Sequence, residues 1–335
     1  MSIPQARILI SHLSGARILI TGGTGFLGSR LTSLIGTYPV EAIIVPSRTH
    51  GNYSPDRTQY VGPYDLTIVE DIRQLLRIHR PDVVIHLAAN VGGIGANRDM
   101  PGDFFYNNMA MGLNLIHESM KAGVEKFIQI GTVCSFPKFT KCPFQIEDLW
   151  NGFPEETNAP YGIAKKALLT MLMAYQQQYS FRSVYLIPTN LYGPRDNFDL
   201  NTSHVIPALI RKCFEAKALN KDSVEIWGTG EATREFLYVD DCANAIIKSI
   251  GLPDIGPFCI GSGEEIKIRD LVDLIANLIG YEGDFVYNNL KPDGQPRRNV
   301  DSSNFREVAG WSSEVSLEQG LRDTISWYET AGDDR

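Results

Sequence analysis

Short apolar runs alternate along this chain with longer segments that are compatible with helix. Each apolar run has the length of a buried strand, and the predicted strands cover residues 18–21, 41–45, 66–69, 83–87, 126–130 and 183–188. Helix-compatible segments lie over residues 26–34, 104–122 and 161–179. Strands that alternate with helices of this length favour right-handed βαβ units. The pattern therefore predicts an α/β protein with a doubly wound parallel sheet.

A glycine-rich turn follows the first predicted strand. Gly22, Gly25 and Gly28 are evenly spaced, and Phe26 and Leu27 begin the predicted helix. Glycines allow a tight turn and let backbone N–H groups approach a pyrophosphate at the start of a helix. A glycine pattern alone is weak evidence, but here it has a strand before it and a helix after it. The context predicts a Rossmann-type, dinucleotide-binding fold.

The chain becomes less regular after about residue 190, where prolines interrupt it. We expect a dinucleotide-binding domain over 16–190 and a smaller C-terminal α/β substrate lobe over 191–335, with 235–258 returning to the first domain. Residues 6–10 repeat the sequence of residues 16–20, and only the second copy leads into the glycine turn. Residues 1–15 are therefore expected to be an N-terminal extension. The alternative is that both copies pair as strands.

The residue that reads the adenosine ribose is expected to follow the second strand. Sites that prefer NAD usually place Asp or Glu there, whereas NADP sites supply an arginine. This chain has Pro46, Ser47 and Arg48 at that position. We therefore expect NADP(H), with Arg48 on the 2′-phosphate. A solvated Arg48, and with it a preference for NAD, is the alternative.

Tyr161 and Lys165 lie four residues apart in a predicted helix, so both side chains can face one site. An ammonium beside a phenol favours the phenolate and is expected to lower the tyrosine pKa. Thr132 adds a hydroxyl group just after the strand that precedes this helix. Such a Tyr–Lys pair is common by chance, and the glycine turn and Thr132 are what favour a catalytic role.

This arrangement resembles the extended short-chain dehydrogenase/reductase superfamily. The resemblance implies that Thr132, which replaces the usual serine, acts with Tyr161 and Lys165 on a carbonyl group. It also implies cofactor contacts along the carboxyl edge of the sheet. The residues concerned are Asp65 and Leu66 beside adenine, Ala88 and Ala89 after the fourth strand, and Pro188, Asn190 and Leu191 near the nicotinamide.

More specific blocks, over residues 91–97, 131–134, 188–194 and 203–209, resemble the GDP-L-fucose synthase family. The resemblance implies epimerisation at C3 and C5 and NADPH-dependent reduction at C4 of a GDP-4-keto-6-deoxy-hexose. Cys134 and His204 match the acid/base pair of the family, and their ordinary pKa values are on either side of neutrality. Taken singly, Cys134 could be a packing residue and His204 a surface residue.

Holding a nucleotide diphosphate on an acidic protein requires well-placed cations. The candidate substrate residues are Asn190, His204, Arg211, Trp227, Arg234 and Lys291. Trp227 could stack near the nucleotide, although a core tryptophan is almost as common. Arg297 and Arg298 could be a solvated basic pair.

Composition restricts the partners and the compartment. The 335 residues carry a net charge of −8, so no overall basic field favours nucleic acid or an anionic membrane. Five cysteines without paired spacing argue against disulfides or a metal site and favour the cytoplasm. The apolar runs are too short to span a membrane. Helices 104–122 and 161–179 are expected to form the interface of a homodimer, as is common in the superfamily.

Two other functions remain open from the sequence. The first is an enzyme that only reduces or only epimerises a related GDP-sugar, such as a GDP-deoxyheptose. The second is a binding protein that senses NADP(H) without turnover. Retention of Tyr161, Lys165, Cys134 and His204 favours the combined reaction over both.

Overall fold

A seven-stranded parallel sheet organises the larger lobe of the computed structural model, which describes residues 12–49, 57–92, 98–253, 256–291 and 294–331. The strand order is β10-β6-β5-β4-β1-β2-β3. The strands are β1 (Arg17–Thr21), β2 (Ala42–Pro46), β3 (Thr58–Val61), β4 (Val83–His86), β5 (Lys126–Ile130), β6 (Ser183–Pro188) and β10 (Phe258–Ile260). This order confirms the predicted doubly wound, Rossmann-type fold.

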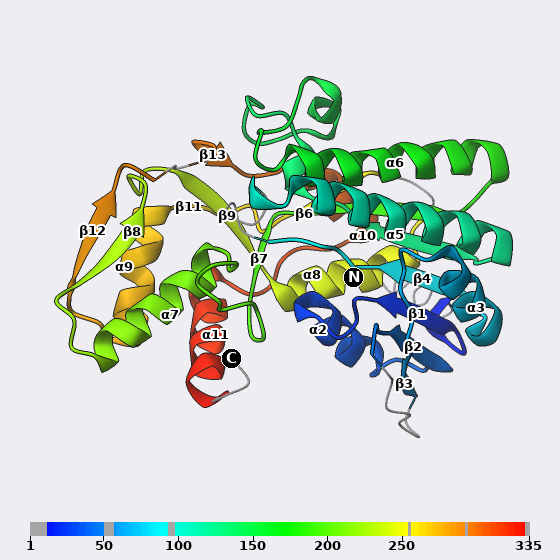
Figure 1. Cartoon of the computed structure of the whole chain (residues 1–335), viewed down its shortest axis with the longest axis horizontal. Helices are drawn as coiled ribbons and strands as arrows, with labels where there is room; N and C mark the ends of the chain where they lie inside the picture. The colour runs from blue at the N-terminus through cyan, green and yellow to red at the C-terminus, as the bar shows by residue number, and fades with distance from the viewer. Residues whose placement is uncertain (1–11, 50–56, 93–97, 254–255, 292–293, 332–335) are drawn as a thin grey trace.

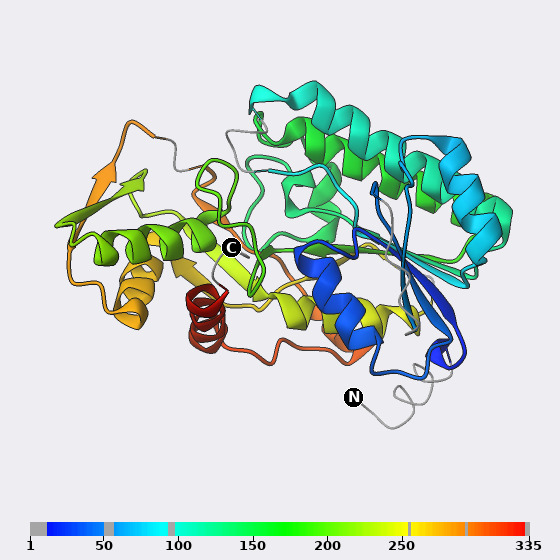
Figure 2. The same ribbon diagram turned by 60° about the horizontal axis from the view of Figure 1, so that its bottom comes forward.

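Helices cover both faces of this sheet (Figures 1 and 2). One face carries α3 (Val69–His79), α5 (Pro101–Ala122) and α6 (Ala159–Tyr179), and the other carries α2 (Phe26–Ile35), α8 (Val239–Ile250) and α10 (Ser303–Ala309). Alternate side chains of β1 enter different cores, with Ile18 and Ile20 on the α2 side and Leu19 on the α3 side. Both faces of the strand are therefore apolar, as in the run that predicted it.

The prediction of a strand over residues 66–69 is wrong, because these residues form a turn and the start of a helix. The strand in this region is β3, a partly exposed edge strand whose sequence, TQYV, has no apolar run. Asp65 instead forms a turn, because its carboxylate accepts hydrogen bonds from the Thr67 backbone N–H at 2.8 Å and the Thr67 hydroxyl at 2.7 Å. Val69 begins helix α3 directly after this turn.

The described part of the predicted N-terminal extension packs on the larger lobe. Leu13 is fully buried in the core beside α2, and the Gly15 backbone N–H donates to the Pro39 carbonyl at 2.9 Å. The first copy of the repeat, residues 6–10, lies outside the described residues. Among the described residues, no helix is both long and apolar enough to cross a membrane.

The smaller lobe is built around strand β9 (Thr233–Tyr238), which pairs with β7 (Asn190–Tyr192), β11 (Glu265–Lys267) and β13 (Arg297–Arg298). A second, two-stranded sheet joins β8 (Ser223–Trp227) to β12 (Asp284–Asn288), and helices α7 (Val205–Ala218), α9 (Ile268–Ile279) and α11 (Leu317–Thr330) enclose a third core. The chain returns to the larger lobe through α8 and β10 and again through α10 (Figure 1). These crossings bring β9 and β13 close to the carboxyl edge of the main sheet.

Candidate functional site

A cleft of about 1340 Å³ extends from the carboxyl edge of the main sheet into the smaller lobe. Its walls include the β1–α2 turn, the ends of β5 and β6, the start of α6, and parts of α7 and β8. A second cavity, of about 200 Å³ beside Asp82 and Lys126, is lined by no residue of the predicted site. Ligands of open α/β sheets bind outside the carboxyl ends of the strands. The large cleft is therefore the candidate site.

The glycine turn is shaped for close backbone approach. A Cβ atom on Gly28 would lie 2.0 Å from the Gly22 carbonyl oxygen, and one on Gly22 would lie 2.9 Å from the Ala88 backbone nitrogen. Gly22 also has a φ of +71°, which favours glycine. Gly25 caps helix α2 and has no side chain to cover the first N–H groups of the helix, and Gly25, Phe26 and Leu27 all line the cleft. This cradle fits a dinucleotide pyrophosphate.

The residues predicted to contact the rest of a dinucleotide line the same cleft. Arg48 and Asp65 both line the cleft. Hydrogen bonds from Thr67 lower the Asp65 pKa, and the nearby charge of Arg48 lowers it further. The other lining residues that were predicted are Leu66, Ala88, Ala89, Pro188, Asn190 and Leu191. The structure therefore brings the predicted adenosine and nicotinamide contacts together along the edge of one sheet.

A close contact between helix α6 and the segment after β5 positions the predicted catalytic side chains. Thr132 caps the short 3-10 helix η1 (Val133–Ser135), and its Oγ1 accepts a hydrogen bond from the Cys134 backbone N–H at 3.1 Å. A Cβ atom on Gly162 would lie 2.4 Å from the Cys134 carbonyl oxygen, so only glycine allows this approach. Tyr161 is thereby held beside Thr132 and Cys134 in the wall of the cleft.

Lys165 lies one helical turn beyond Tyr161 and is almost fully buried. Its Nζ is 5.9 Å from the centroid of the Tyr161 ring, and burial lowers the Lys165 pKa to about 8. The prediction that the Tyr161 pKa is lowered is wrong. Burial raises this pKa, and the neighbouring Cys134 raises it further. Tyr161 is therefore a phenol at neutral pH, which is the form that donates a proton.

His204 directly precedes helix α7 and is exposed to the cleft rather than enclosed in the core. The surrounding protein atoms still desolvate the imidazole and lower its pKa, and the positive charge of Arg298 lowers it further. His204 is therefore neutral at neutral pH and able to accept a proton. It comes from the smaller lobe, whereas Cys134 comes from the larger one.

Trp227 projects into the far end of the cleft and is 53% exposed, so it is not a core tryptophan. Two ammonium groups flank its ring, with Lys291 Nζ 4.9 Å and Lys212 Nζ 5.9 Å from the centroid. Arg234 also lines the cleft. An aromatic face beside several cations can hold a nucleotide base and its phosphates.

The structure does not place Arg211 in the cleft. Its guanidinium instead pairs with Glu215 at 2.7 Å and donates to the Phe198 carbonyl at 3.1 Å. The next residue, Lys212, lines the cleft and was missed from the sequence. Val205, Ala208 and Lys212 line it at positions i, i+3 and i+7 of α7, and this helical spacing is a signal that could have identified Lys212.

Comparisons with a family model and with known proteins agree with each other. Residues 18–258 match the model of the NAD dependent epimerase/dehydratase family. The chain is 40% identical to the GDP-L-fucose synthase of Sinorhizobium fredii, over 92% of this chain and 94% of that protein.

Two solved structures resemble this protein across almost its whole length. One is a GDP-mannoheptose C4 reductase from Campylobacter jejuni with NADP bound, at a TM-score of 0.83 and 28% identity over 95% of this chain and 99% of the other. The other is a GDP-L-fucose synthetase from Naegleria fowleri bound to NADP, at a TM-score of 0.81 and 27% identity over 94% of each chain.

Proposed function

This chain belongs to the NAD dependent epimerase/dehydratase family, and within it to the GDP-L-fucose synthase family, and from this we propose that it converts a GDP-4-keto-6-deoxy-hexose with NADPH. The reaction would combine epimerisation at C3 and C5 with reduction at C4, most simply of the mannose derivative to GDP-L-fucose. The single observation that supports it is that one cleft is lined by Cys134 and His204 and also by Thr132 and Tyr161, with the buried Lys165 beside the Tyr161 ring.

Epimerisation starts at the carbons that flank the C4 ketone. When a base removes a proton there, the electron pair of the C–H bond moves onto the ketone oxygen to form an enolate. Cys134 and His204 lie on walls from different lobes, so one can take the proton and the other can return one to the opposite face. The hydroxyl groups of Thr132 and Tyr161 would hydrogen-bond the enolate oxygen.

Reduction uses Tyr161 and Lys165 of the same site. NADPH, when bound along the glycine turn, supplies the hydride that C4 receives. Tyr161 donates its phenolic proton to the C4 oxygen, and the positive charge of Lys165 stabilises the phenolate that remains. Asn190, whose side chain is fixed by a 2.8 Å hydrogen bond to the Glu235 carbonyl, helps to orient the sugar. The site therefore carries the groups that both reactions need.

The cations around Trp227 are proposed to bind the GDP moiety. We predict that Lys212→Met raises the KM for the GDP-sugar about tenfold with little change in kcat, because one cation beside the diphosphate is lost. Arg211→Met is the matched control, since Arg211 pairs with Glu215 outside the cleft. Steady-state kinetics of both variants test this, and a larger KM effect from Arg211→Met would contradict the assignment.

Arg48 is proposed to contact the 2′-phosphate of NADPH. Arg48→Gln is expected to raise the KM for NADPH at least tenfold and to leave the KM for NADH nearly unchanged, because only NADPH carries this phosphate. Arg77 is an exposed residue of α3, and Arg77→Gln serves as the control. Equal changes for the two cofactors would show that Arg48 does not read the phosphate.

We also propose a homodimer in the cytoplasm. Helices α5 and α6 pack side by side (Figure 1) and expose large apolar side chains, among them Tyr106, Leu113 and Met173. A two-fold axis beside them would bury these side chains in a four-helix interface. All five cysteines are free thiols, which supports a reducing compartment. The molar mass in solution, measured by light scattering, tests the dimer.

The decisive test of the reaction is incubation of the protein with GDP-4-keto-6-deoxy-D-mannose and NADPH in D₂O. Loss of the reduced-nicotinamide absorbance together with deuterium at both C3 and C5 of the product would support the proposal. Oxidation without deuterium would leave a plain reductase, and deuterium without oxidation would leave an epimerase. If neither occurred, the proposed substrate would be wrong and GDP-linked 4-keto heptoses would be tested next.

A further inference from the structure

Arg298 connects the two proposed acid/base groups. This residue ends strand β13 and lines the cleft, and its Nη1 donates to the Cys134 sulfur at 3.9 Å. Its charge also reaches His204, where it helps to lower the pKa of the imidazole. A guanidinium is always charged at physiological pH. Arg298 is therefore a fixed positive charge beside Cys134 rather than part of a solvated pair.

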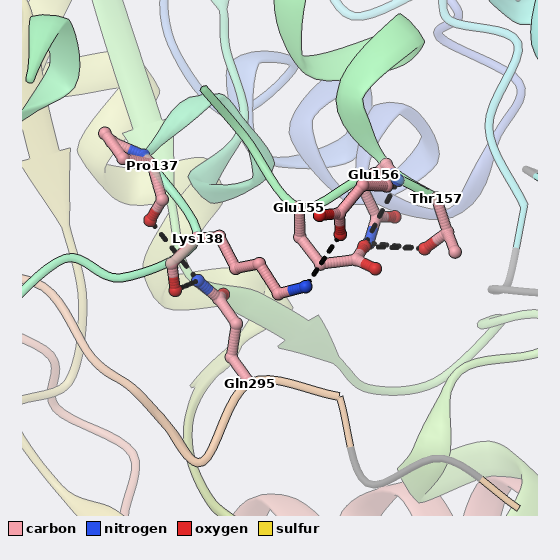
Figure 3. Close-up of polar contacts among 7 residues, drawn as sticks. Pro137, Lys138, Glu155, Glu156, Thr157 and Gln295 are labelled. Carbon is pink, nitrogen blue, oxygen red and sulfur yellow. Dashed lines mark hydrogen bonds and ion pairs between the residues drawn. The ribbon is translucent and has the colours of Figure 1, made fainter. Parts of the chain in front are cut away.

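The guanidinium is held in place from behind. Arg298 Nε donates to Gln295 Oε1 at 2.9 Å, and Gln295 is buried. The Gln295 amide in turn donates to the Lys138 carbonyl at 2.8 Å, in the segment that follows Cys134 (Figure 3). Strand β13 adds a backbone constraint, because it pairs with β9 at Thr233 and Arg234. The charge is therefore positioned by both lobes of the protein.

The neighbouring arginine provides a contrast. The side chain of Arg297 is 57% exposed and forms an ion pair with Glu265 at 2.5 Å. Burial raises the pKa of Cys142, and the nearby charge of Arg297 acts in the opposite direction. The arginine whose charge lowers the His204 pKa is Arg298. Two adjacent arginines thus lie near two different thiols, and only Arg298 lies near the proposed acid/base groups.

We propose that Arg298 is a positioning residue for the epimerisation half of the reaction, in which it holds Cys134 as the thiolate that removes the proton. This inference rests on the proposed function. The thiolate takes a proton from the carbon beside the ketone and becomes a thiol, while the C–H electron pair moves onto the C4 oxygen. Arg298 keeps its own proton throughout. An opposite charge near 4 Å favours the thiolate, as at other reactive cysteines.

The first experiment needs no substrate. Wild type, Arg298→Gln and Arg297→Gln are treated with iodoacetamide at neutral pH, and mass spectrometry follows the peptides that carry Cys134 and Cys142. Because the thiolate is the reactive form, we expect Cys134 to react about tenfold more slowly in Arg298→Gln, with Cys142 unchanged. Arg297→Gln should leave Cys134 at the wild-type rate. An unchanged Cys134 rate in Arg298→Gln would overturn the proposal.

Two further variants separate charge from folding. Arg298→Lys keeps a cation and should restore most of the Cys134 reactivity. Gln295→Leu removes the support of the guanidinium and should give a rate between those of Arg298→Gln and wild type. NADPH binding, followed by cofactor fluorescence, reports whether each variant is folded. If Arg298→Lys were as slow as Arg298→Gln in folded protein, the charge would not be the cause and the proposal would fail.

The second experiment compares the two half-reactions. Arg298→Gln is expected to lower deuterium exchange at C3 and C5 about tenfold more than it lowers the initial rate at which NADP⁺ oxidises GDP-L-fucose, because that oxidation needs no proton removal from carbon. An equal fall in both rates would overturn the proposal by indicating a general role in binding. Failure of the proposed function would be recognised separately, because wild type would then catalyse neither reaction while the alkylation result still stood.

Discussion

Replacement of Tyr161 with phenylalanine is expected to lower NADPH oxidation about a thousandfold, while slower exchange of the C3 and C5 protons continues. The phenol is the group placed to protonate the C4 oxygen as hydride arrives, and general acids contribute about 10²–10⁴-fold. Burial keeps Tyr161 protonated at neutral pH, so the acid is ready before the reaction begins. Exchange persists because Cys134 and His204 are intact and Thr132 still donates to the enolate oxygen.

The measurement is NADPH oxidation and deuterium incorporation in the same sample, so that the two half-reactions share one enzyme concentration. Tyr185→Phe is the matched control, since the Tyr185 hydroxyl donates to the Lys165 carbonyl at 2.9 Å and lies outside the cleft. We expect Tyr185→Phe to change reduction by only a few fold. Reduction by Tyr161→Phe at a rate near that of wild type would remove Tyr161 from the mechanism.

The fold was predictable where the pattern of apolar residues indicates only one type of secondary structure. Strands buried on both faces, such as β1 and β4, are continuous apolar runs, and their boundaries are confirmed within a residue. Strand β3 could not be found in this way, because an edge strand with one solvated side has neither an apolar run nor a clear alternation. The family resemblance is confirmed by relatives that match most of the chain.

The site was predictable where local spacing fixes geometry. Tyr161 and Lys165 share a helix, and the glycine turn is a single segment, so their arrangement follows from a few adjacent residues. The roles assigned to these residues stay predictions. Arg298 could not be identified in the same way, because its distance from Cys134 depends on how β13 docks on β9 and on Gln295. Such contacts between distant segments exist only in the folded chain.

The Tyr161 pKa shows a second limit of sequence reasoning. The sequence places an ammonium near the phenol, and a positive charge alone would favour the phenolate. Burial acts in the opposite direction and dominates, because Lys165 is 5.9 Å from the ring centroid and is itself desolvated. The balance between charge and burial depends on packing around both groups, which spacing along a helix does not reveal.

Replacement of Cys134 with serine is expected to slow proton exchange at C3 and C5 about a hundredfold. A serine hydroxyl is a far weaker acid than a thiol, so the substituted side chain would supply almost no anionic base near neutral pH. The initial rate at which NADP⁺ oxidises GDP-L-fucose should change little, because that step depends on Tyr161 and Lys165. NMR in D₂O measures the exchange rate, and the nicotinamide absorbance measures the oxidation rate.

Two comparisons make this result specific. Cys142→Ser changes the other partly buried thiol and should leave exchange at the wild-type rate. His204→Gln removes the proposed acid/base group of the smaller lobe, so it should also slow exchange. The double variant with Cys134→Ser should show a smaller loss of exchange than the product of the two single losses. If Cys134→Ser exchanged protons as fast as wild type, the base would be another group. Arg298 would then have no thiolate to hold, and the cleft would retain only its reductive half.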